Sequence, residues 1–182
     1  FRITPFLVDH SAYDAYALLV EADGKRLFYS GDFRSHGRKS KLHDRLIANP
    51  PQGIDVLLLE GSSLSRIDTD ASFPSESELE EQLVAQLQST KGVTLFHTSA
   101  QNIDRLVTVY RACKRTDRPL LIDLYAAAIL AATENPHIPQ SNWPGVLLYL
   151  PHRQAIQVKR NAWFDLLSKH SSHRIYNNQL KT

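Results

Sequence analysis

Apolar and polar positions near the start of the chain follow the two-residue period of β-strands. Residues 2–8, 15–22 and 26–30 carry β-branched, aromatic or alternating apolar side chains, which favours three strands. Between the second and third of these segments lies an Asp23-Gly24 pair, a strong signal for a two-residue hairpin turn. The pattern therefore predicts an antiparallel hairpin in this part of the chain.

A continuous apolar run and a helical pattern follow. Residues 56–59 are all apolar and lead into Glu60, which is typical of a buried strand that ends in a loop. Ser75 and Glu78 have the spacing of a helix capping box, and leucines recur after them at helical spacing. We expect a helix that begins near residue 75 and turns one apolar stripe towards a core.

From residue 92 onward the pattern alternates between strands and helices. The predicted strands are residues 92–98, 119–123 and 145–150, and the predicted helices are residues 99–115, 125–133 and 153–170. Such alternation is typical of βαβ units with parallel strands. Trp163 and Phe164 lie in the last predicted helix, and we expect them in the core rather than as platforms for base stacking.

The composition is that of an ordinary globular protein. Of the 182 residues, 42% are hydrophobic and 22% are charged, and a formal net charge of +2 is too small to indicate a nucleic-acid partner by itself. The single cysteine, Cys113, cannot form an internal disulfide, which favours a reducing compartment. No apolar run of the sequence approaches the roughly 20 residues needed to cross a bilayer. We therefore expect a soluble, cytoplasmic protein without a membrane partner, and the sequence leaves a homo-oligomer open.

Three side chains that can carry chemistry lie at or just after predicted strand ends: His10, Asp32 and Glu60. Imidazole nitrogen and carboxylate oxygen are common ligands of zinc, and rigid sheets often position functional loop residues. Each residue also has an ordinary interpretation. His10 fits a histidine with a local hydrogen bond, and Asp32 fits a turn residue that bonds its own backbone.

The order of these segments resembles a known family. The segments DHSAYDA, SGDFR and LLLEG together resemble the second half of a metallo-β-lactamase-fold hydrolase. The segment LFHTSAQNIDRLVTVYRACKRTDRPLLID is similar to the start of the β-CASP insertion of ribonuclease J and of the cleavage and polyadenylation endonucleases. The resemblance spans roughly residues 1–134.

The resemblance implies a fold and a division of the chain. The expected class is α/β, with the C-terminal half of a metallo-β-lactamase αββα fold followed by a Rossmann-like β-CASP region. Residues 1–65 would form the partial metallo-β-lactamase-like region, residues 66–91 a connecting helix, and residues 92–182 the β-CASP-like region.

The resemblance also implies roles for the three candidate residues. His10 matches a metal-binding histidine, and Asp32 matches an aspartate that bridges two zinc ions. Glu60 matches a catalytic acid that orients a histidine. Two such ions lower the pKa of a bound water and supply hydroxide near neutral pH. The implied function is zinc-dependent hydrolysis of RNA phosphodiester bonds by the full-length protein.

The chain departs from the family pattern in one large respect. The His-x-His-x-Asp-His cluster that supplies most metal ligands is missing from the sequence. Zinc held by His10 and Asp32 alone would be weakly bound, so we expect this chain by itself to be inactive. We favour a partial chain, which fits a start at Phe1 and the lack of methionine. The alternative is a non-catalytic nucleic-acid or protein interaction module that kept the scaffold and lost the metals.

Two basic stretches suggest where RNA would bind. In residues 34–45, the predicted phosphate contacts are Arg34, Arg38, Lys39 and Lys41. A second stretch extends from His152 to Arg174. Both stretches also fit solvated surface, and their charges do not decide between the two interpretations.

A third candidate phosphate site lies in the segment HTSAQNIDR. Ser99 or Asn102 stands at the start of a predicted helix, where backbone N–H groups can bind phosphate. An ordinary helix N-cap explains the same residues and is the interpretation we favour.

Overall fold

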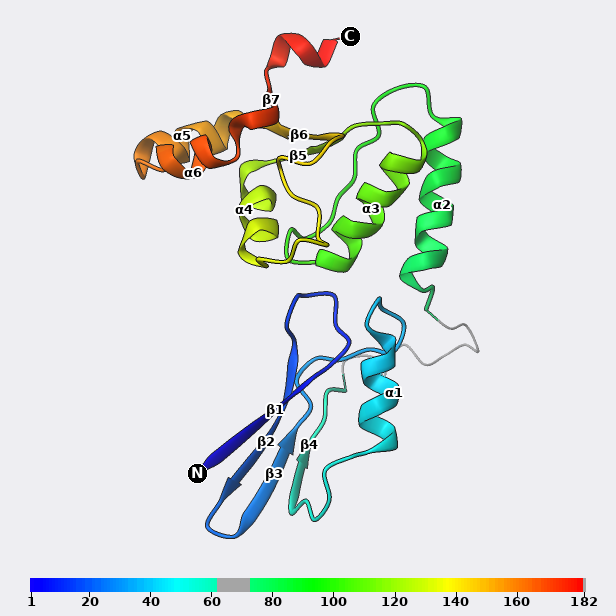
Figure 1. The fold of residues 1–182 in the computed structure, drawn as a ribbon, viewed down its shortest axis with the longest axis vertical. Helices are drawn as coiled ribbons and strands as arrows, with labels where there is room; N and C mark the ends of the chain where they lie inside the picture. Colours follow the sequence, from blue (N-terminus) through cyan, green and yellow to red (C-terminus); the bar gives the residue numbers. More distant parts are fainter. Residues whose placement is uncertain (62–72, 182) are drawn as a thin grey trace. The chain divides into compact units, whose positions relative to one another are not determined.

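The structure is a computed structural model that describes residues 1–61 and 73–181 (Figure 1). The chain forms two compact units, Phe1–Glu78 and Leu79–Thr182. The predicted boundary between residues 65 and 66 lies outside the described residues. Each unit combines a small sheet with helices, so the chain belongs to the α/β class, as predicted.

The first unit is built on a four-stranded sheet in the order β1-β2-β3-β4. Its elements are β1 (Arg2–Leu7), β2 (Tyr16–Ala22), β3 (Lys25–Tyr29), α1 (Ser40–Ala48) and β4 (Val56–Leu58). Neighbours β1–β2 and β2–β3 are antiparallel, whereas β3 and β4 are parallel and joined through α1. Helix α1 was not predicted from the sequence, because residues 34–45 were interpreted as a basic stretch, although Leu42 and Leu46 have helical spacing.

The predicted hairpin is confirmed. β2 and β3 pair from Ala22 opposite Lys25, with only Asp23 and Gly24 between them. Both turn residues are left-handed, with φ of 51° and 73°. Two positive φ angles are what the tight hairpin turn needs to match the twist of its strands, and Asp-Gly adopts them at low cost.

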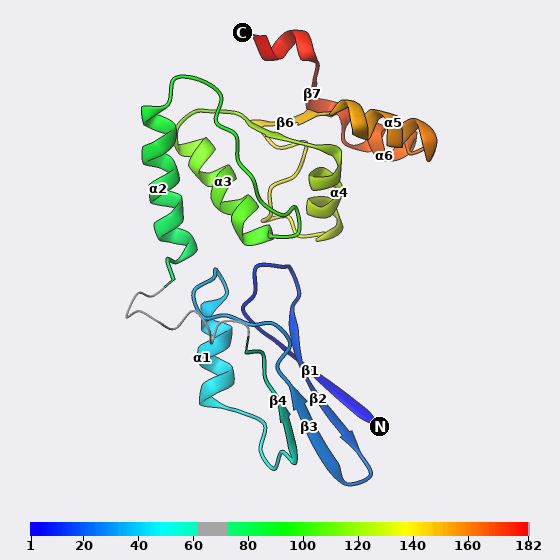
Figure 2. The same ribbon diagram turned by 180° about the vertical axis from the view of Figure 1, so that it is seen from behind.

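One face of this sheet carries the core of the first unit. Ala17, Leu19 and Phe28 are buried on it, and Leu46 of α1 packs against them. Phe6 meets Phe28 edge to face, with ring centroids 5.8 Å apart. The contact of Leu46 with this cluster places α1 on this face, and Figures 1 and 2 show the helix running alongside the strands.

The opposite face of the sheet, called here the outer face, is apolar along all four strands. Alternation and register place on it Lys25, at the start of β3, and the following apolar residues: Ile3, Pro5, Leu7, Tyr16, Leu18, Val20, Ala22, Leu27, Tyr29, Val56 and Leu58. Several of these side chains are strongly exposed, from 38% for Leu7 to 49% for Ile3. A sheet that is apolar on both faces is built to be covered on both.

The strand predicted at residues 56–59 forms as β4, but the prediction that it is buried is wrong. Among the described residues β4 pairs only with β3, so it is an edge strand, and Val56, Leu57, Leu58 and Leu59 are all exposed. A continuous apolar run indicates that the strand suits a buried environment. The described part of the first unit provides no strand on the other side of β4.

The second unit has a parallel three-stranded sheet in the order β5-β6-β7. Its strands are β5 (Leu120–Ile122), β6 (Val146–Tyr149) and β7 (Arg174–Ile175). Its helices are α3 (Ile103–Arg115), α4 (Leu124–Ala132), α5 (His152–Arg160), α6 (Phe164–Lys169) and the 3₁₀ turns η2 (Ser171–His173) and η3 (Asn177–Lys181). Helix α2 (Glu76–Ser89) begins at the end of the first unit and continues into the second.

A cluster between α2 and α3 and the central strand β6 contribute to the interior of the second unit. Val84 and Leu87 of α2 pack against Val109 and Ala112 of α3. The central strand β6 is buried at alternate positions. The sequence predicts Ile103, Leu106, Val107 and Tyr110 on one apolar face of α3; the structure buries Ile103, Leu106 and Tyr110 and leaves Val107 half-buried.

The predicted capping box of α2 is confirmed. The Ser75 N–H donates to Glu78 Oε2 at 2.6 Å, and the Glu78 N–H donates to Ser75 Oγ at 3.3 Å. The bonds that the Ser75 N–H and, at 2.8 Å, the Ser75 hydroxyl donate to Glu78 Oε2 lower the pKa of Glu78. At α3, Asn102 Oδ1 accepts from the Arg105 N–H at 2.9 Å, which is the ordinary N-cap that the sequence favoured.

Two other predicted elements are wrong. Residues 92–98 form no strand, because no described strand pairs with them; the Arg118 guanidinium instead bonds the carbonyl groups of Leu87, Thr90 and Gly92 beside them. The predicted helix 153–170 is interrupted between α5 and α6, where Ala162 is left-handed with φ of 53°.

The interruption changes the environment of two aromatic residues. Trp163 and Phe164 were expected in the core but are 47% and 57% exposed. Periodicity places an aromatic residue on a helix face only while the helix continues, and α5 ends before both residues. In the described part of the chain, no helix is long and apolar enough to cross a membrane.

Candidate functional site

The three residues singled out in the sequence lie at one edge of the first sheet. Strands β1, β3 and β4 run in the same direction, because β2 is antiparallel to both β1 and β3, and β4 is parallel to β3. Their carboxyl ends therefore meet at the same edge. His10, Asp32 and Glu60 follow these ends within a few residues.

Glu60 fixes the loop that carries Asp32. Its Oε2 accepts from the Phe33 N–H at 3.0 Å, and its own N–H donates to Ser30 Oγ at 2.9 Å. The Ser30 N–H in turn donates to the Leu58 carbonyl at 2.9 Å. The loop from Ser30 to Phe33 is thus bonded on both sides of Asp32 to the end of β4.

Gly31 allows this loop to pass close to β2. Its φ is 57°, a left-handed conformation that other residues adopt at a cost. A Cβ at this position would lie 2.8 Å from the carbonyl oxygen of Tyr16. Asp32 follows directly and is exposed, so its carboxylate stands on a constrained backbone with its side chain open to solvent.

His10 is held by its own loop. The Ala12 N–H donates to His10 Nδ1 at 3.2 Å. An Nδ1 that accepts a hydrogen bond carries no proton, so the proton of the neutral ring is on Nε2. A metal bound at Nδ1 would replace this bond, and a metal bound at Nε2 would move the proton to Nδ1. Metal binding by His10 therefore requires the bond from Ala12 to break.

Asp9, beside His10, is the acid that the sequence did not place in a site. It is completely buried, and its carboxylate accepts from the N–H groups of Gly37 at 2.7 Å and Lys39 at 3.3 Å. A Cβ at Gly37 would collide with this carboxylate. Asp9 therefore joins the His10 loop to the basic segment that leads into α1. The burial of Asp9 and its two hydrogen bonds, which local sequence does not reveal, make it the residue that organises these two segments.

The predicted phosphate-binding residues have different environments. The side chain of Arg34 is only 15% exposed. Its Nε lies 3.8 Å from Asp9 Oδ1, and its Nη1 lies 3.6 Å from Glu76 Oε1. The Lys39 ammonium donates to the Ala12 carbonyl at 2.9 Å.

The other two predicted contacts are more accessible. Arg38 is half-buried, whereas Lys41 on α1 is exposed. Beside them, burial and then the Arg34 charge lower the pKa of His36. Among these candidates, Arg34 and Lys39 contact groups of the protein itself, whereas Lys41 is exposed to solvent.

The described residues do not make a zinc site on their own. A structural or catalytic zinc needs at least three protein ligands. Within residues 1–61 and 73–181, no group of three or more His, Cys, Asp or Glu side chains is placed to hold a metal ion. His10 and Asp32 are suitable donors, but they do not complete a set, and no reaction step through zinc follows from them here.

The two hollows described in the second unit are lined by residues other than the predicted site residues. One hollow of about 630 Å³ is lined by Tyr110, Trp143 and Lys114, among others. Cys113 also faces it, and burial raises the pKa of its thiol, which disfavours the reactive thiolate. Elsewhere in the unit, Ser141 Oγ and His170 Nδ1 form a buried hydrogen bond of 2.8 Å.

Comparisons with known proteins add information on the fold alone. Neither the family models nor the curated proteins contain a match. Among solved structures, the chain is similar to a crystal structure of a protein of unknown function from Enterococcus faecalis V583. The identity is 19% and the TM-score 0.59, and the match covers 95% of this chain and 53% of the other. The chain therefore spans about half the length of that solved protein.

Proposed function

We propose that the complete protein is a metal-dependent hydrolase of RNA phosphodiester bonds and that this chain supplies part of its active site. One observation carries the proposal: His10, Asp32 and Glu60, chosen from sequence alone, follow strands whose carboxyl ends meet at one edge. Glu60 is also bonded to the loop of Asp32, as a residue that positions a ligand would be.

The donor chemistry suits this role. His10 contributes an imidazole and Asp32 an exposed carboxylate, the nitrogen and oxygen ligands that zinc commonly takes. In the proposal the remaining ligands come from parts of the protein other than the described residues. Glu60 acts through the Asp32 loop and is a positioning residue.

The outer face supports the half-fold that the proposal assumes. In an αββα fold each sheet is covered by helices on one face and by the other sheet on the second. The first unit has α1 on one face of its sheet and an exposed outer face on the other, which is apolar apart from Lys25 at the start of β3. We propose that a second sheet of the complete protein covers the outer face, with the metallo-β-lactamase-like arrangement as the result.

A second candidate function is a non-catalytic interaction module on the same scaffold. The observation in its favour is the bond from the Ala12 N–H to His10 Nδ1, which metal binding would have to break. In this alternative the carboxyl-edge residues only stabilise their loops.

The decisive experiment compares metal content and RNA hydrolysis in the complete polypeptide. Asp32→Asn is expected to lower zinc content and to reduce hydrolysis by at least about 100-fold, since loss of a ligand should exceed the 10–100-fold typical of residues behind the ligands. Asp23→Asn is the matched control, because Asp23 lies in the hairpin turn, beyond the amino end of β3. The 182-residue chain alone is expected to hydrolyse no RNA.

Two outcomes would contradict the proposal. Zinc content that is the same in Asp32→Asn and in the unaltered protein would remove Asp32 from the ligand set. A complete polypeptide without metal and without hydrolysis would leave the interaction module as the better explanation.

A further inference from the structure

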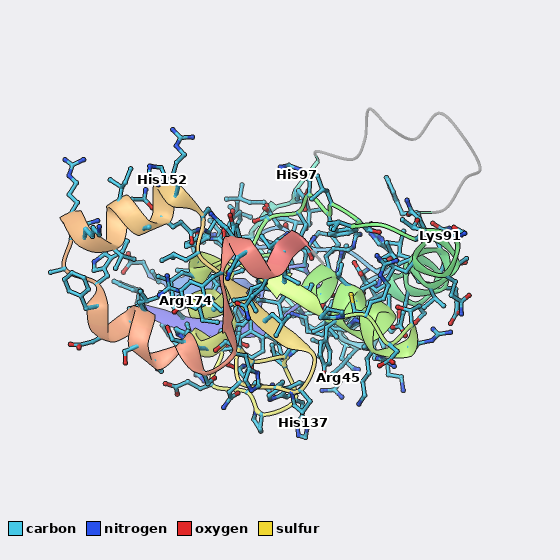
Figure 3. The ribbon with its side chains drawn as sticks, turned by 90° about the horizontal axis from the view of Figure 1, so that it is seen from above. Arg45, Lys91, His97, His137, His152 and Arg174 are labelled. Carbon is cyan, nitrogen blue, oxygen red and sulfur yellow. The ribbon has the colours of Figure 1, made fainter. Side chains whose placement is uncertain are left out.

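The turn between α5 and α6 presents apolar and basic side chains together. We call this group the α5–α6 tip: Ile156, Lys159, Arg160, Trp163 and Phe164. Ile156, Trp163 and Phe164 are 52%, 47% and 57% exposed, and Lys159 and Arg160 are exposed as well. Figure 3 shows the two helices side by side, with His152 at the start of α5 and long side chains of that helix extending away from the unit.

The backbone of the tip is ordered by its own hydrogen bonds. The Trp163 N–H donates to the Val158 carbonyl at 3.0 Å, and the Asn161 N–H donates to the Gln157 carbonyl at 2.9 Å. Together with the left-handed Ala162, these bonds form the usual cap that ends a helix. Val158 is buried and anchors α5 to the unit. The exposure of Trp163 therefore follows from a defined turn.

The tip is cationic. The segment from α5 to α6 carries Arg153, Lys159, Arg160 and Lys169 against one acid, Asp165. Among the described residues, neither Lys159 nor Arg160 forms an ion pair. An apolar protein partner would have to strip water from these charges without compensation, whereas an anionic partner would pair with them.

We propose that the α5–α6 tip binds single-stranded nucleic acid. Bases stack on Trp163 and Phe164, and the phosphate backbone lies along Lys159 and Arg160. Flat aromatic faces beside flexible cations are the recurring elements of single-strand binding, because every base has a face to stack and every nucleotide a charge to neutralise. This site lies in the second unit and needs no metal, so it stands apart from the hydrolase proposal.

The first test measures stacking. The 182-residue chain is titrated into a fluorescein-labelled oligouridylate in the presence of a metal chelator, and binding is followed by fluorescence anisotropy. Trp163→Ala is expected to weaken binding about tenfold, or about 1.4 kcal/mol, because it removes the aromatic face on which a base stacks. Trp163→Phe should keep most of the affinity. Tyr125→Ala is the matched control, because Tyr125 is an aromatic residue of α4 with a similar exposure of 52%.

An abasic oligonucleotide of the same length separates stacking from charge. It should bind the unaltered chain about as weakly as the oligouridylate binds Trp163→Ala. Phe164→Ala provides a second stacking variant should Trp163→Ala fail to fold.

The second test measures the charges. Lys159→Gln and Arg160→Gln are each expected to flatten the dependence of log Kd on log salt concentration by about 0.7, the value for one phosphate contact on a single strand. Lys114→Gln, an exposed cation of α3, should leave the slope unchanged. These variants retain both aromatic residues and so test the backbone contacts separately.

Three results would overturn the proposal. Unchanged affinity in both Trp163→Ala and Phe164→Ala would exclude stacking at the tip. If Tyr125→Ala lowered the affinity for the oligouridylate as much as Trp163→Ala does, binding would not be specific to the tip. Binding to vesicles of anionic phospholipid without binding to the oligouridylate would identify a membrane surface as the partner. Because metal is chelated throughout, failure of the hydrolase proposal leaves these results interpretable.

Discussion

Strands β4 and β6 begin with the same three residues and have opposite environments. Val56 and Leu58 of β4 are 47% and 48% exposed, whereas Val146 and Leu148 of β6 are completely buried. β6 is the central strand of its sheet and lies between β5 and β7, but β4 is an edge strand. The same Val-Leu-Leu sequence therefore forms a strand in both units, and its neighbours decide whether that strand is interior.

The two units differ in how far the apolar side chains of their sheets are covered. In the second unit the strand with the apolar run has neighbours on both sides, and its alternate side chains are buried. In the first unit the outer face stays exposed across all four strands. An apolar surface of this kind marks an interaction site. The first unit is thus the one to which the proposed function adds a second sheet.

The largest expected effect comes from truncating the two matched leucines. In the 182-residue chain, Leu148→Ala should lower the free energy of unfolding by about 3 kcal/mol, because it opens a cavity in a packed interior. Leu58→Ala should cost less than about 1 kcal/mol, since much of that side chain is already in contact with water. Urea denaturation followed by circular dichroism measures both.

The same pair sharpens the comparison in the complete polypeptide. If another sheet covers the outer face there, the cost of Leu58→Ala should rise towards that of Leu148→Ala. Equal costs of the two substitutions in the 182-residue chain would contradict the difference in burial between β4 and β6.

A smaller difference is expected between two glycines beside these sheets. Gly31 in the first unit and Gly145 in the second both have positive φ, 57° and 78°. Alanine at either site pays about 1–2 kcal/mol for the left-handed backbone. Only at Gly31 would the new Cβ also meet a backbone atom, the Tyr16 carbonyl oxygen, whereas nothing lies within 4 Å at Gly145.

Gly31→Ala should therefore destabilise the chain by about 1–3 kcal/mol more than Gly145→Ala, the usual cost of overpacking. Paired urea titrations of the two variants measure the difference. Equal destabilisation would show that the loop before Asp32 can relax, and would weaken the argument that this loop is rigidly held.

The smallest expected effect is a dependence of stability on pH in the second unit. His170 is buried, and burial, with a smaller effect of Lys169, lowers its pKa. Below the ordinary histidine pKa of about 6.5 the unfolded chain takes up a proton that the folded chain does not, so stability falls as the pH falls. Above that value this contribution is fully present.

The first unit should contribute less to the dependence of stability on pH. Burial and Arg34 also lower the pKa of His36, but Asp9 and Glu76 oppose the shift. Thermal unfolding between about pH 8 and pH 5 measures the effect. His170→Gln should flatten the profile, and His137→Gln, at an exposed position, should not. A profile that His170→Gln leaves unaltered would show that His170 is not the group responsible.

Local signals in the sequence identified much of the fold. The Asp23-Gly24 turn, the Ser75–Glu78 capping box and the apolar face of α3 were all predicted, because each depends on residues close together in the chain. The strand predicted at residues 92–98 failed for the opposite reason, since a strand exists only where another strand pairs with it.

The candidate site shows the same limit. His10, Asp32 and Glu60 were named from the sequence, but their common edge follows from strand directions that only pairing sets. The role of Asp9 was out of reach, because its partners Gly37 and Lys39 lie far along the chain.

The sequence by itself determined where the chain turns, caps its helices and carries its apolar runs, since these depend on local backbone preferences and on the chemistry of adjacent side chains. Only the tertiary structure decided which apolar runs are covered. It placed β6 inside and β4 at an edge, and it left Trp163 and Phe164 at a tip. Burial depends on contacts with residues that are distant in the sequence. The pattern of apolar residues along the chain indicates only that a segment suits a buried environment.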